Sequence, residues 1–366
     1  MNDYLNNIKH LFSSSKRYNI NDFYAQNKFP EEAWKFVMQE IISALDLNNL
    51  DGLEIAKIFE GLGYASEDGG LNFATGAHML AAVIPFSIYA SEEQKENYLQ
   101  PMLNGDKVCA NAITETEAGS DIFSMTSNAV QHENKYILNG TKIFCSSINE
   151  AKMALVYVVT NKEKGAHGGI TTFILDSSQF KIGQIFSKMG LRTCSIGEMI
   201  FDNTEVDASQ ILSKEGAGFG IFTTAMNWER IGLSAVYVGT MQRLFEMSVE
   251  YAKTRKQGGN TIGKYQAVSH KIAEMKTLIN TSRITVHDAA KKLKHERTVN
   301  EHAAMCKLYV SETYVKVCQM AMQIHGGNGY MEDYGIERCL RDAHAGTIYS
   351  GTSEIQKNII AKWNGL

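Results

Sequence analysis

The repeat of apolar residues changes twice along this chain, and the change limits the folds that the chain can adopt. Over residues 30–110 apolar side chains recur every three or four positions, the period of a helix that buries one face. From about residue 111 to 212 the period shortens to two, as in half-buried strands, and it then becomes helical again. This order predicts an α+β chain that is mostly α, with domains at 1–110, 111–213 and 214–366.

Local signals place several helices of the first domain. The segment 53–62 is amphipathic, and Gly61 and Gly63 are expected to end it. Residues 73–89 are apolar on all sides, which predicts an internal helix. Ser91-Glu92-Glu93-Gln94 has a capping hydroxyl followed by an acidic first turn, so a helix is expected to begin there.

The middle and last domains show different patterns. Tyr136-Ile-Leu-Asn139-Gly140-Thr-Lys-Ile-Phe144 predicts a hairpin with Asn-Gly as a type I′ turn. Short strands with Gly and Asn between them favour a small barrel or sandwich. Gly216-Ala-Gly218-Phe-Gly220 looks like a phosphate loop, but it follows a polar loop, so we interpret it as the entry to the next helix. The long amphipathic segments expected to form a helical bundle are 219–252, 265–294 and 301–324.

Composition excludes several classes of function. The 36 basic and 40 acidic residues give a net charge of −4, and no Lys/Arg run suggests nucleic acid or an anionic membrane as a partner. The six cysteines are scattered without ligand spacing, so we expect no metal site and no disulfide framework. The first ten residues lack the apolar core of a signal peptide, and no apolar run reaches the length of a membrane span. A cytoplasmic protein with reduced thiols is expected.

One loop is rich in small hydrogen-bonding groups. Asn111-Ala-Ile-Thr-Glu-Thr-Glu-Ala-Gly-Ser-Asp121 stands where the helical period gives way to the strand period. Its hydroxyls, and the backbone freed by Gly119, could contact a phosphate or a flat polar ring. Taken alone, the stretch is better explained as a turn between domains.

Five separated signatures, in order, resemble the acyl-CoA dehydrogenase family of flavoenzymes. The resemblance runs from about Leu53 to the C-terminus. It implies a helical N-terminal domain, a middle β-barrel and a C-terminal four-helix bundle, with FAD between barrel and bundle and a neighbouring subunit completing the FAD site. The signatures are Ile113-Thr-Glu-x-x-Ala-Gly-Ser-Asp121, Gly140-x-Lys142-x-Phe144-Cys-Ser146, Lys188-Met-Gly-Leu-Arg192, Tyr251-Ala-x-x-Arg255 with Gln266-Ala-Val, and Gln323-Ile-x-Gly326-Gly-Asn-Gly329 with Arg341-Asp-Ala and Ile348-Tyr-x-Gly351-Thr352.

The resemblance implies a set of cofactor-binding residues. Two phosphates need a cation and N–H donors, and the edge of a flavin needs hydrogen-bond donors. Each of these residues, taken singly, has an ordinary structural explanation as a surface or core residue. The implied residues of the same subunit are Thr114, Ser120, Phe144, Cys145, Ser146, Thr352 and Glu354. Those implied to reach the FAD of the partner subunit are Arg255, Gln257, Gln266, Gln323, Gly326 and Gly327.

The position of the catalytic base departs from most of the family. Many relatives carry a glutamate where this chain has Ser350, which cannot accept a proton near neutral pH. A minority carry the base on the first bundle helix, at the position of Glu229. Glu229 is therefore implied to be the base, although a carboxylate near a helix start is also favoured by the helix dipole. Asn227, Arg230, Ser120 and Gly351 are implied to contact the substrate.

Three further departures concern the substrate. The chain lacks the Pro-x-x-Tyr-Gly-Gly loop that most relatives have before their third helix, so its site is expected to be more open. Gly258-Gly259 replaces a Phe-Gly pair and removes an aromatic contact near the cofactor. Lys362 stands where some relatives have an arginine that touches CoA, and lysine cannot pair with phosphate in a bidentate way.

Trp228-Glu229 together with Ile348-Tyr-Ser350 is most similar to the branch that oxidises prolyl or other aminoacyl groups on carrier proteins in antibiotic biosynthesis. An aminoacyl or acyl carrier protein is then the expected partner. Two alternatives stay open: a conventional acyl-CoA dehydrogenase of short- or branched-chain catabolism, and a catalytically silent protein that serves as a scaffold. Also left open are the acyl group, a two- or four-electron oxidation, an electron-transfer flavoprotein or oxygen as acceptor, and a homodimer or homotetramer.

Overall fold

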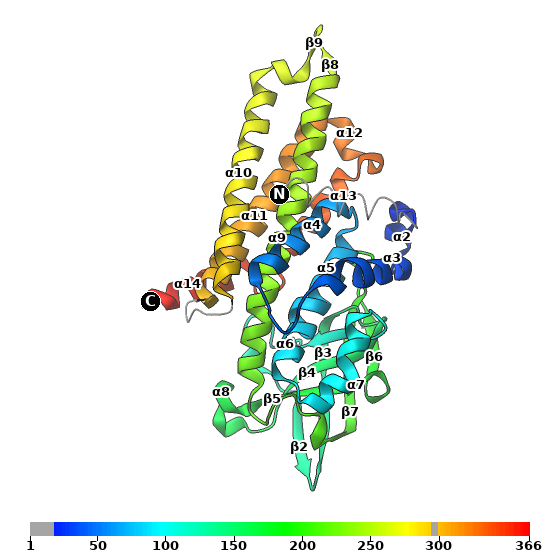
Figure 1. Cartoon of the computed structure of the whole chain (residues 1–366), viewed down its shortest axis with the longest axis vertical. Coiled ribbons are helices and arrows are strands. Elements are labelled where there is room, and N and C mark those ends of the chain that lie inside the picture. Colours follow the sequence, from blue (N-terminus) through cyan, green and yellow to red (C-terminus); the bar gives the residue numbers. More distant parts are fainter. Residues whose placement is uncertain (1–17, 294–298) are drawn as a thin grey trace.

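A computed structural model describes residues 18–293 and 299–366 of the chain. The molecule is elongated: a bundle of long helices forms one end, a curled sheet forms the other, and the N-terminal helices pack beside both (Figure 1). The predicted order of helices, strands and helices is confirmed.

The described N-terminal helices are α2 (Ile20–Gln26), α3 (Glu31–Phe36), α4 (Gly52–Ala65), α5 (Gly69–His78), α6 (Ile84–Tyr89) and α7 (Glu92–Leu103), with π-helical turns at Val37–Ile41 and Met79–Val83 and a 3₁₀ turn at Ile42–Ala44.

Two expectations about the N-terminal helices are confirmed. Helix α7 begins at the predicted cap, and the cap is a full capping box: the Ser91 hydroxyl accepts the Gln94 N–H and the Gln94 side chain accepts the Ser91 N–H. The internal apolar helix is also present, as the continuous helical stretch Gly69–Tyr89. By length and hydropathy this stretch could cross a membrane, contrary to our expectation that no apolar run is long enough. In the fold, 89% of its most apolar window is buried inside the protein, so it serves as a core helix.

The prediction that Gly61 and Gly63 end a helix is wrong, because both lie inside α4. Helix α4 packs closely along the first bundle helix, α9 (Gly218–Thr254). A Cβ at Gly63 would lie 2.0 Å from the carbonyl oxygen of Val236, and one at Gly239 would lie 2.0 Å from that of Glu60. These glycines therefore allow two helices to approach until their backbones touch.

The change Gly63→Ala should lower the free energy of unfolding by about 1–3 kcal/mol, because the added methyl group meets backbone that cannot move aside. The matched control is Gly220→Ala, in the first turn of α9, where a Cβ meets nothing within 4 Å. That control should leave stability unchanged or raise it by about 0.4–1 kcal/mol. Urea denaturation of both variants measures the difference, and equal stability would show that α4 and α9 are not packed this closely.

The middle region is one curled seven-stranded sheet with the order β1-β4-β2-β3-β7-β6, in which β5 also pairs with β4. Apolar side chains from its strands form a buried cluster of their own. This sheet is the expected barrel-like domain. Its strands are β1 (Val108–Ala112), β2 (Asn128–His132), β3 (Lys135–Ser146), β4 (Ala151–Val159), β5 (Ile170–Asp176), β6 (Lys181–Ile185) and β7 (Ile196–Asp207).

The predicted Asn139-Gly140 turn is wrong, because β3 runs unbroken through these residues. The hairpin turn lies earlier, at Glu133-Asn134, where His132 pairs with Lys135. Gly140 has a φ of 144° at a shift in register against β7, and a Cβ there would lie 2.1 Å from Ser127 Oγ. This glycine therefore forms a bulge instead of a turn.

The last region is the expected helical bundle. Helix α9 begins at Gly218, so the Gly216–Gly220 stretch is the helix entry that we predicted. A short β8–β9 hairpin (Lys256–Gln257, Asn260–Thr261) joins α9 to α10 at the end of the bundle that lies away from the sheet (Figure 1). The other helices are α10 (Gln266–Lys292), α11 (Val299–His325), α12 (Gly327–Tyr330), α13 (Ile336–Ala345) and α14 (Ser353–Trp363).

Candidate active site

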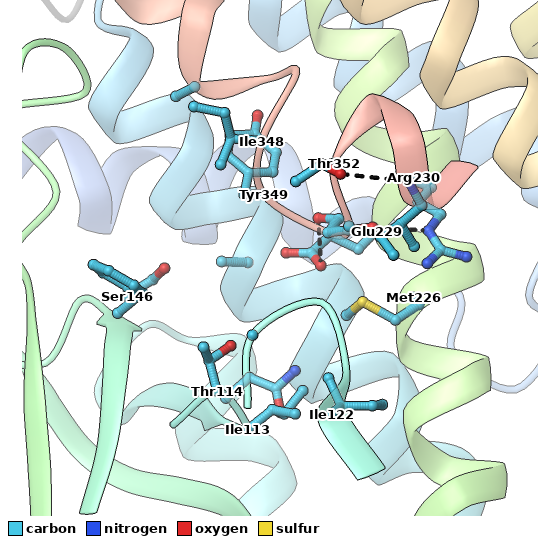
Figure 2. A pocket seen from close by; sticks show the side chains of 18 of the residues that line it. Ile113, Thr114, Ile122, Ser146, Met226, Glu229, Arg230, Ile348, Tyr349 and Thr352 are labelled. Atoms are coloured by element: carbon cyan, nitrogen blue, oxygen red, sulfur yellow. Dashed lines mark hydrogen bonds between the residues drawn. The ribbon is translucent and has the colours of Figure 1, made fainter. Parts of the chain in front are cut away.

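A cavity of about 1140 Å³ lies where the sheet, the N-terminal helices and the bundle meet. Figure 2 shows Thr114 and Ser146 from the sheet region facing Glu229 from α9 across it. The cavity therefore brings together residues that are far apart in the chain. The sequence-predicted residues that line it are Thr114, Ser120, Phe144, Ser146, Glu229, Arg230, Gly351 and Thr352.

The loop that carries Thr114 is held in place by the buried ion pair of Lys142 and Glu115. Lys142 Nζ donates to Glu115 Oε1 at 2.7 Å and to the Ile113 carbonyl at 3.0 Å. The backbone N–H of Ile143 donates to the Thr114 carbonyl at 2.8 Å. Burial alone would raise the pKa of the Glu115 carboxyl, but Lys142 and hydrogen bonds from Thr126 and Ser127 lower it to about 2. Glu115 is thus ionised, and the pair holds the loop against the end of β3.

Phe144 is an exposed aromatic residue on the cavity wall. Its φ is 56°, an uncommon value for a residue with a side chain, and its ring is 59% exposed. It lies at a shift in register between β3 and β7, which turns its side chain into the cavity. The next residue, Cys145, is buried in the sheet core, so only its backbone can serve a ligand. Ser146 again lines the cavity.

Glu229 is the only carboxylate among the described residues that line the cavity. It lies about three turns into α9, well past the helix start, so the helix dipole does not explain it. The side chain is almost fully buried, and its Oε2 accepts a hydrogen bond from Ser350 Oγ at 2.9 Å. Burial raises the pKa of Glu229 to about 7, against the opposing effects of Ser350, Arg230 and Lys307. The group can therefore exchange a proton near neutral pH.

The neighbouring Arg230 is also buried, and its Nε donates to the Ser350 carbonyl at 3.0 Å. A guanidinium beside Glu229 offsets part of the cost of burying an ionised carboxylate. Asn227 does not line the cavity: its side chain is buried and its Oδ1 has no partner within residues 18–293 and 299–366. The implied substrate contact of Asn227 thus has no direct route into this cavity.

The remaining predicted cofactor residues lie away from the cavity. Arg255, Gln257 and Gln266 lie in or next to the β8–β9 hairpin, at the far end of the bundle (Figure 1). Three others lie where α11 passes into α12, and all six are exposed. Glu354 is exposed on the first turn of α14 and does not line the cavity either. The three at the α11–α12 junction are Gln323, Gly326 and Gly327.

Two residues of the cavity wall were missed by sequence analysis. Nδ1 of His78 accepts the Cys109 N–H at 3.0 Å, which leaves Nε2 to donate to the Met102 carbonyl at 3.1 Å. Burial lowers the pKa of His78 to about 4, so the ring is a neutral part of the wall. Asn111, at the start of our loop motif, lies instead in β1, and its buried Oδ1 has no partner among the described residues. Because Asn111 lines the cavity, a bound molecule with an N–H group could donate a hydrogen bond to this Oδ1.

Comparison with known proteins identifies the family of this chain. Residues 110–204 match the acyl-CoA dehydrogenase middle domain, and residues 216–364 match the acyl-CoA dehydrogenase C-terminal domain. Together these models cover well over half of the chain. The chain therefore belongs to the acyl-CoA dehydrogenase family.

Particular relatives are similar over most of their length. An L-prolyl-[peptidyl-carrier protein] dehydrogenase from a Serratia species is 37% identical over 321 residues, which is 87% of this chain and 83% of that protein. The crystal structure of the prolyl acyl carrier protein oxidase AnaB matches with a TM-score of 0.95 at 35% identity, over 100% of this chain and 98% of that one. The FAD complex of PigA matches with a TM-score of 0.94 at 34% identity, over 100% and 97%.

Proposed function

We propose that this protein is an FAD-dependent dehydrogenase that oxidises an aminoacyl thioester on a carrier protein, with Glu229 as the base that takes the α-proton. One observation carries the proposal: a buried carboxylate with a pKa raised to about 7 lines the cavity opposite Thr114 and Ser146. The similarity to prolyl-carrier-protein enzymes supports the substrate class.

The residues present fit FAD. The Thr114 and Ser146 hydroxyls, the Phe144 ring and the unpartnered Asn111 amide all face the cavity, and together they suit a flat ring with polar edges. We propose that these residues and Thr352 hold the cofactor. When bound, FAD supplies the hydride acceptor of the oxidation.

The chain's own residues would then prepare the substrate. The Cα–H of a thioester is weakly acidic, so a carboxylate must accept the proton while the carbonyl is polarised by hydrogen bonds. Glu229 supplies the carboxylate. The Ser350 hydroxyl donates a hydrogen bond to it and so holds the Glu229 side chain in one rotamer. Gly351 lines the cavity, and its backbone N–H makes no hydrogen bond within the described residues. This N–H is therefore free to bind the thioester carbonyl. Arg230 and Ser120 would position the arm that carries the acyl group.

Intact-mass analysis of aminoacyl carrier proteins after incubation tests the proposal. Loss of two or four hydrogen atoms from prolyl- or another aminoacyl-carrier protein would support it and give the extent of oxidation. Loss only from acyl-CoA thioesters would identify a conventional acyl-CoA dehydrogenase. A protein that binds no flavin and oxidises neither class would be the silent scaffold.

The rate at which substrate reduces the bound flavin should rise with pH through about 7 and level off above it, because only ionised Glu229 accepts a proton and burial raises its pKa to about 7. Below that pH the rate should fall about tenfold per pH unit. Anaerobic stopped-flow measurements across pH give the profile. A midpoint near the ordinary carboxyl value of 4.5 would show that Glu229 is not the titrating base.

A second copy of the chain is part of the proposal. The exposed residues Arg255, Gln266 and Gly326 lie apart from the cavity, so in one chain they have no cofactor to bind. Tyr330 and Met331, a few residues after Gly326 in the chain, are also exposed, which suits a covered interface. We propose that the protein is a homodimer or homotetramer in the cytoplasm. Oxygen or an electron-transfer flavoprotein would accept the electrons from the flavin. The proposed domains of each chain are residues 1–110, 111–213 and 214–366.

A further inference from the structure

The turn that presents Ser350 to Glu229 has an unusual backbone. Ser350 has a φ of 54° and Gly351 a φ of 89°, so two consecutive residues lie in the left-handed region. Glycine adopts this conformation freely, whereas serine does so at a cost in free energy. Such a turn persists only when its surroundings hold it.

Three side chains hold the turn by its two carbonyl groups. The Ser350 carbonyl accepts hydrogen bonds from Arg230 Nε at 3.0 Å and Gln356 Nε2 at 3.1 Å. The Gly351 carbonyl accepts from Lys307 Nζ at 2.6 Å and from Gln356 Nε2 at 2.7 Å. The donors come from α9, α11 and α14, so each helix fixes the turn from a different side. With both carbonyls turned toward these donors, the Ser350 hydroxyl is left to bind Glu229.

Lys307 is the least expected member of this group. It is only 2% exposed, and its ammonium makes no ion pair with a carboxylate within residues 18–293 and 299–366. Burying a cation against a neutral carbonyl costs free energy that an apolar side chain of the same size would avoid. Burial accordingly lowers the pKa of Lys307 to about 8. Stability of the bundle therefore does not account for this lysine.

We propose that Lys307 is a positioning residue for the base: it fixes the Ser350-Gly351 turn that holds Glu229, and its positive charge favours the ionised form of Glu229. The inference rests on the proposed function of Glu229. It extends the active site to α11. Lys307, on that helix, bonds to the turn, and the turn bonds to Glu229.

The other titratable groups that face Glu229 are two tyrosines and one arginine. Arg230 and Tyr237 lie on α9 and Tyr157 on β4. Burial raises the pKa of both tyrosines far above neutral pH, so they stay uncharged. Arg230 is the other cation, and it lowers the pKa of Glu229 more than Lys307 does. It is unchanged in the Lys307 variants, so a shift of the midpoint in those variants reports the charge of Lys307. The carboxylates that act on Lys307, besides Glu229, are Glu312 on α11 and Glu354 on α14.

The test is Lys307→Met in the FAD-loaded protein, with Lys316→Met as the matched control on the exposed side of α11, where Lys316 pairs with Glu274. The rate of flavin reduction by substrate is measured across pH. The midpoint of the rising limb should move up by about one pH unit, as expected for loss of one nearby charge. The plateau at high pH should fall about tenfold because the turn loosens. The control should keep both wild-type values.

Lys307→Gln separates the two effects and serves as a second variant if Lys307→Met does not fold. It keeps a donor for the Gly351 carbonyl without the charge, so the midpoint should shift while the plateau stays closer to that of the wild type. A folded, FAD-loaded Lys307→Met or Lys307→Gln variant with an unchanged midpoint and plateau would overturn the proposal.

A readout without turnover separates this inference from the proposed function. Ionisation of Glu229, across the cavity from the residues that would hold the flavin, should change the flavin absorbance as pH is varied, and Glu229→Gln should abolish that change. Lys307→Met should move the midpoint of this titration upward in the same way. If the wild-type protein oxidises no thioester but the midpoint still moves, the proposed function fails and the positioning role of Lys307 stands. An unmoved midpoint refutes the role of Lys307 alone.

Discussion

Replacing Glu229 by glutamine should lower the rate at which substrate reduces the bound flavin by about 10²–10⁴-fold, the usual contribution of a general base. Glutamine has nearly the same shape and can still accept the Ser350 hydroxyl, so the fold and FAD binding should be kept. The loss therefore reports the missing proton acceptor and not a collapsed site. Single-turnover stopped-flow measurements with a carrier-bound substrate give the rate directly.

The matched control is Glu93→Gln, an exposed glutamate on the first turn of α7, which should leave the rate unchanged. Placing glutamate at Ser350 in the Glu229→Gln variant tests the geometry further. Because Ser350 Oγ and Glu229 Oε2 are only 2.9 Å apart, a carboxylate from position 350 enters the same space, and partial recovery is expected. A Glu229→Gln variant that reduces its flavin at nearly the wild-type rate would place the base elsewhere.

Arg255→Ala should weaken FAD binding by about 10- to 100-fold, because a phosphate would lose a charge-assisted hydrogen bond. Arg255 is exposed at the far end of the bundle and distant in the fold from the cavity, so this effect is expected only if it acts in a second subunit. Lys253→Ala is the control, since it removes an exposed cation from the last turn of the same helix. Titration of apoprotein with FAD, followed by fluorescence, measures both dissociation constants.

Mixing two defective variants shows directly whether Arg255 acts across an interface. In a mixed pair of Glu229→Gln and Arg255→Ala subunits, one site would combine both defects and the other would have neither. Activity should then recover to about half of the wild-type value in the mixed species, as two-fold symmetry requires. If Arg255 serves its own subunit, every site keeps one defect and mixing restores nothing.

The helices were predictable because their signals are local. The segment 219–252 was identified from its apolar period, and the helix runs Gly218–Thr254. The start of α7 is predictable from a capping serine and an acidic first turn within four residues. Periodicity records which face is buried, and capping groups satisfy N–H donors of the adjacent turn, so neither needs knowledge of the rest of the fold.

The glycines were misread because a glycine has two uses that look alike in sequence. Asn139-Gly140 resembles a hairpin turn and Gly63 a helix stop, yet one is a bulge beside Ser127 and the other lies against the backbone at Val236. Absence of a side chain permits either an unusual φ or a close approach. Which use applies depends on a partner segment that the local sequence does not contain.

For the site, the sequence alone determined the family, the order of its motifs and the candidate pair Glu229 and Ser350, since these depend on residue type and spacing. Only the tertiary structure shows that Ser350, which replaces the usual glutamate base, donates a hydrogen bond to Glu229. It also shows that Lys307 and Gln356 both bond to the carbonyl of Gly351 and so hold the turn. Burial and short distances set the pKa of a carboxylate, and both arise only when α9, α11 and the loop before α14 come together around one cavity.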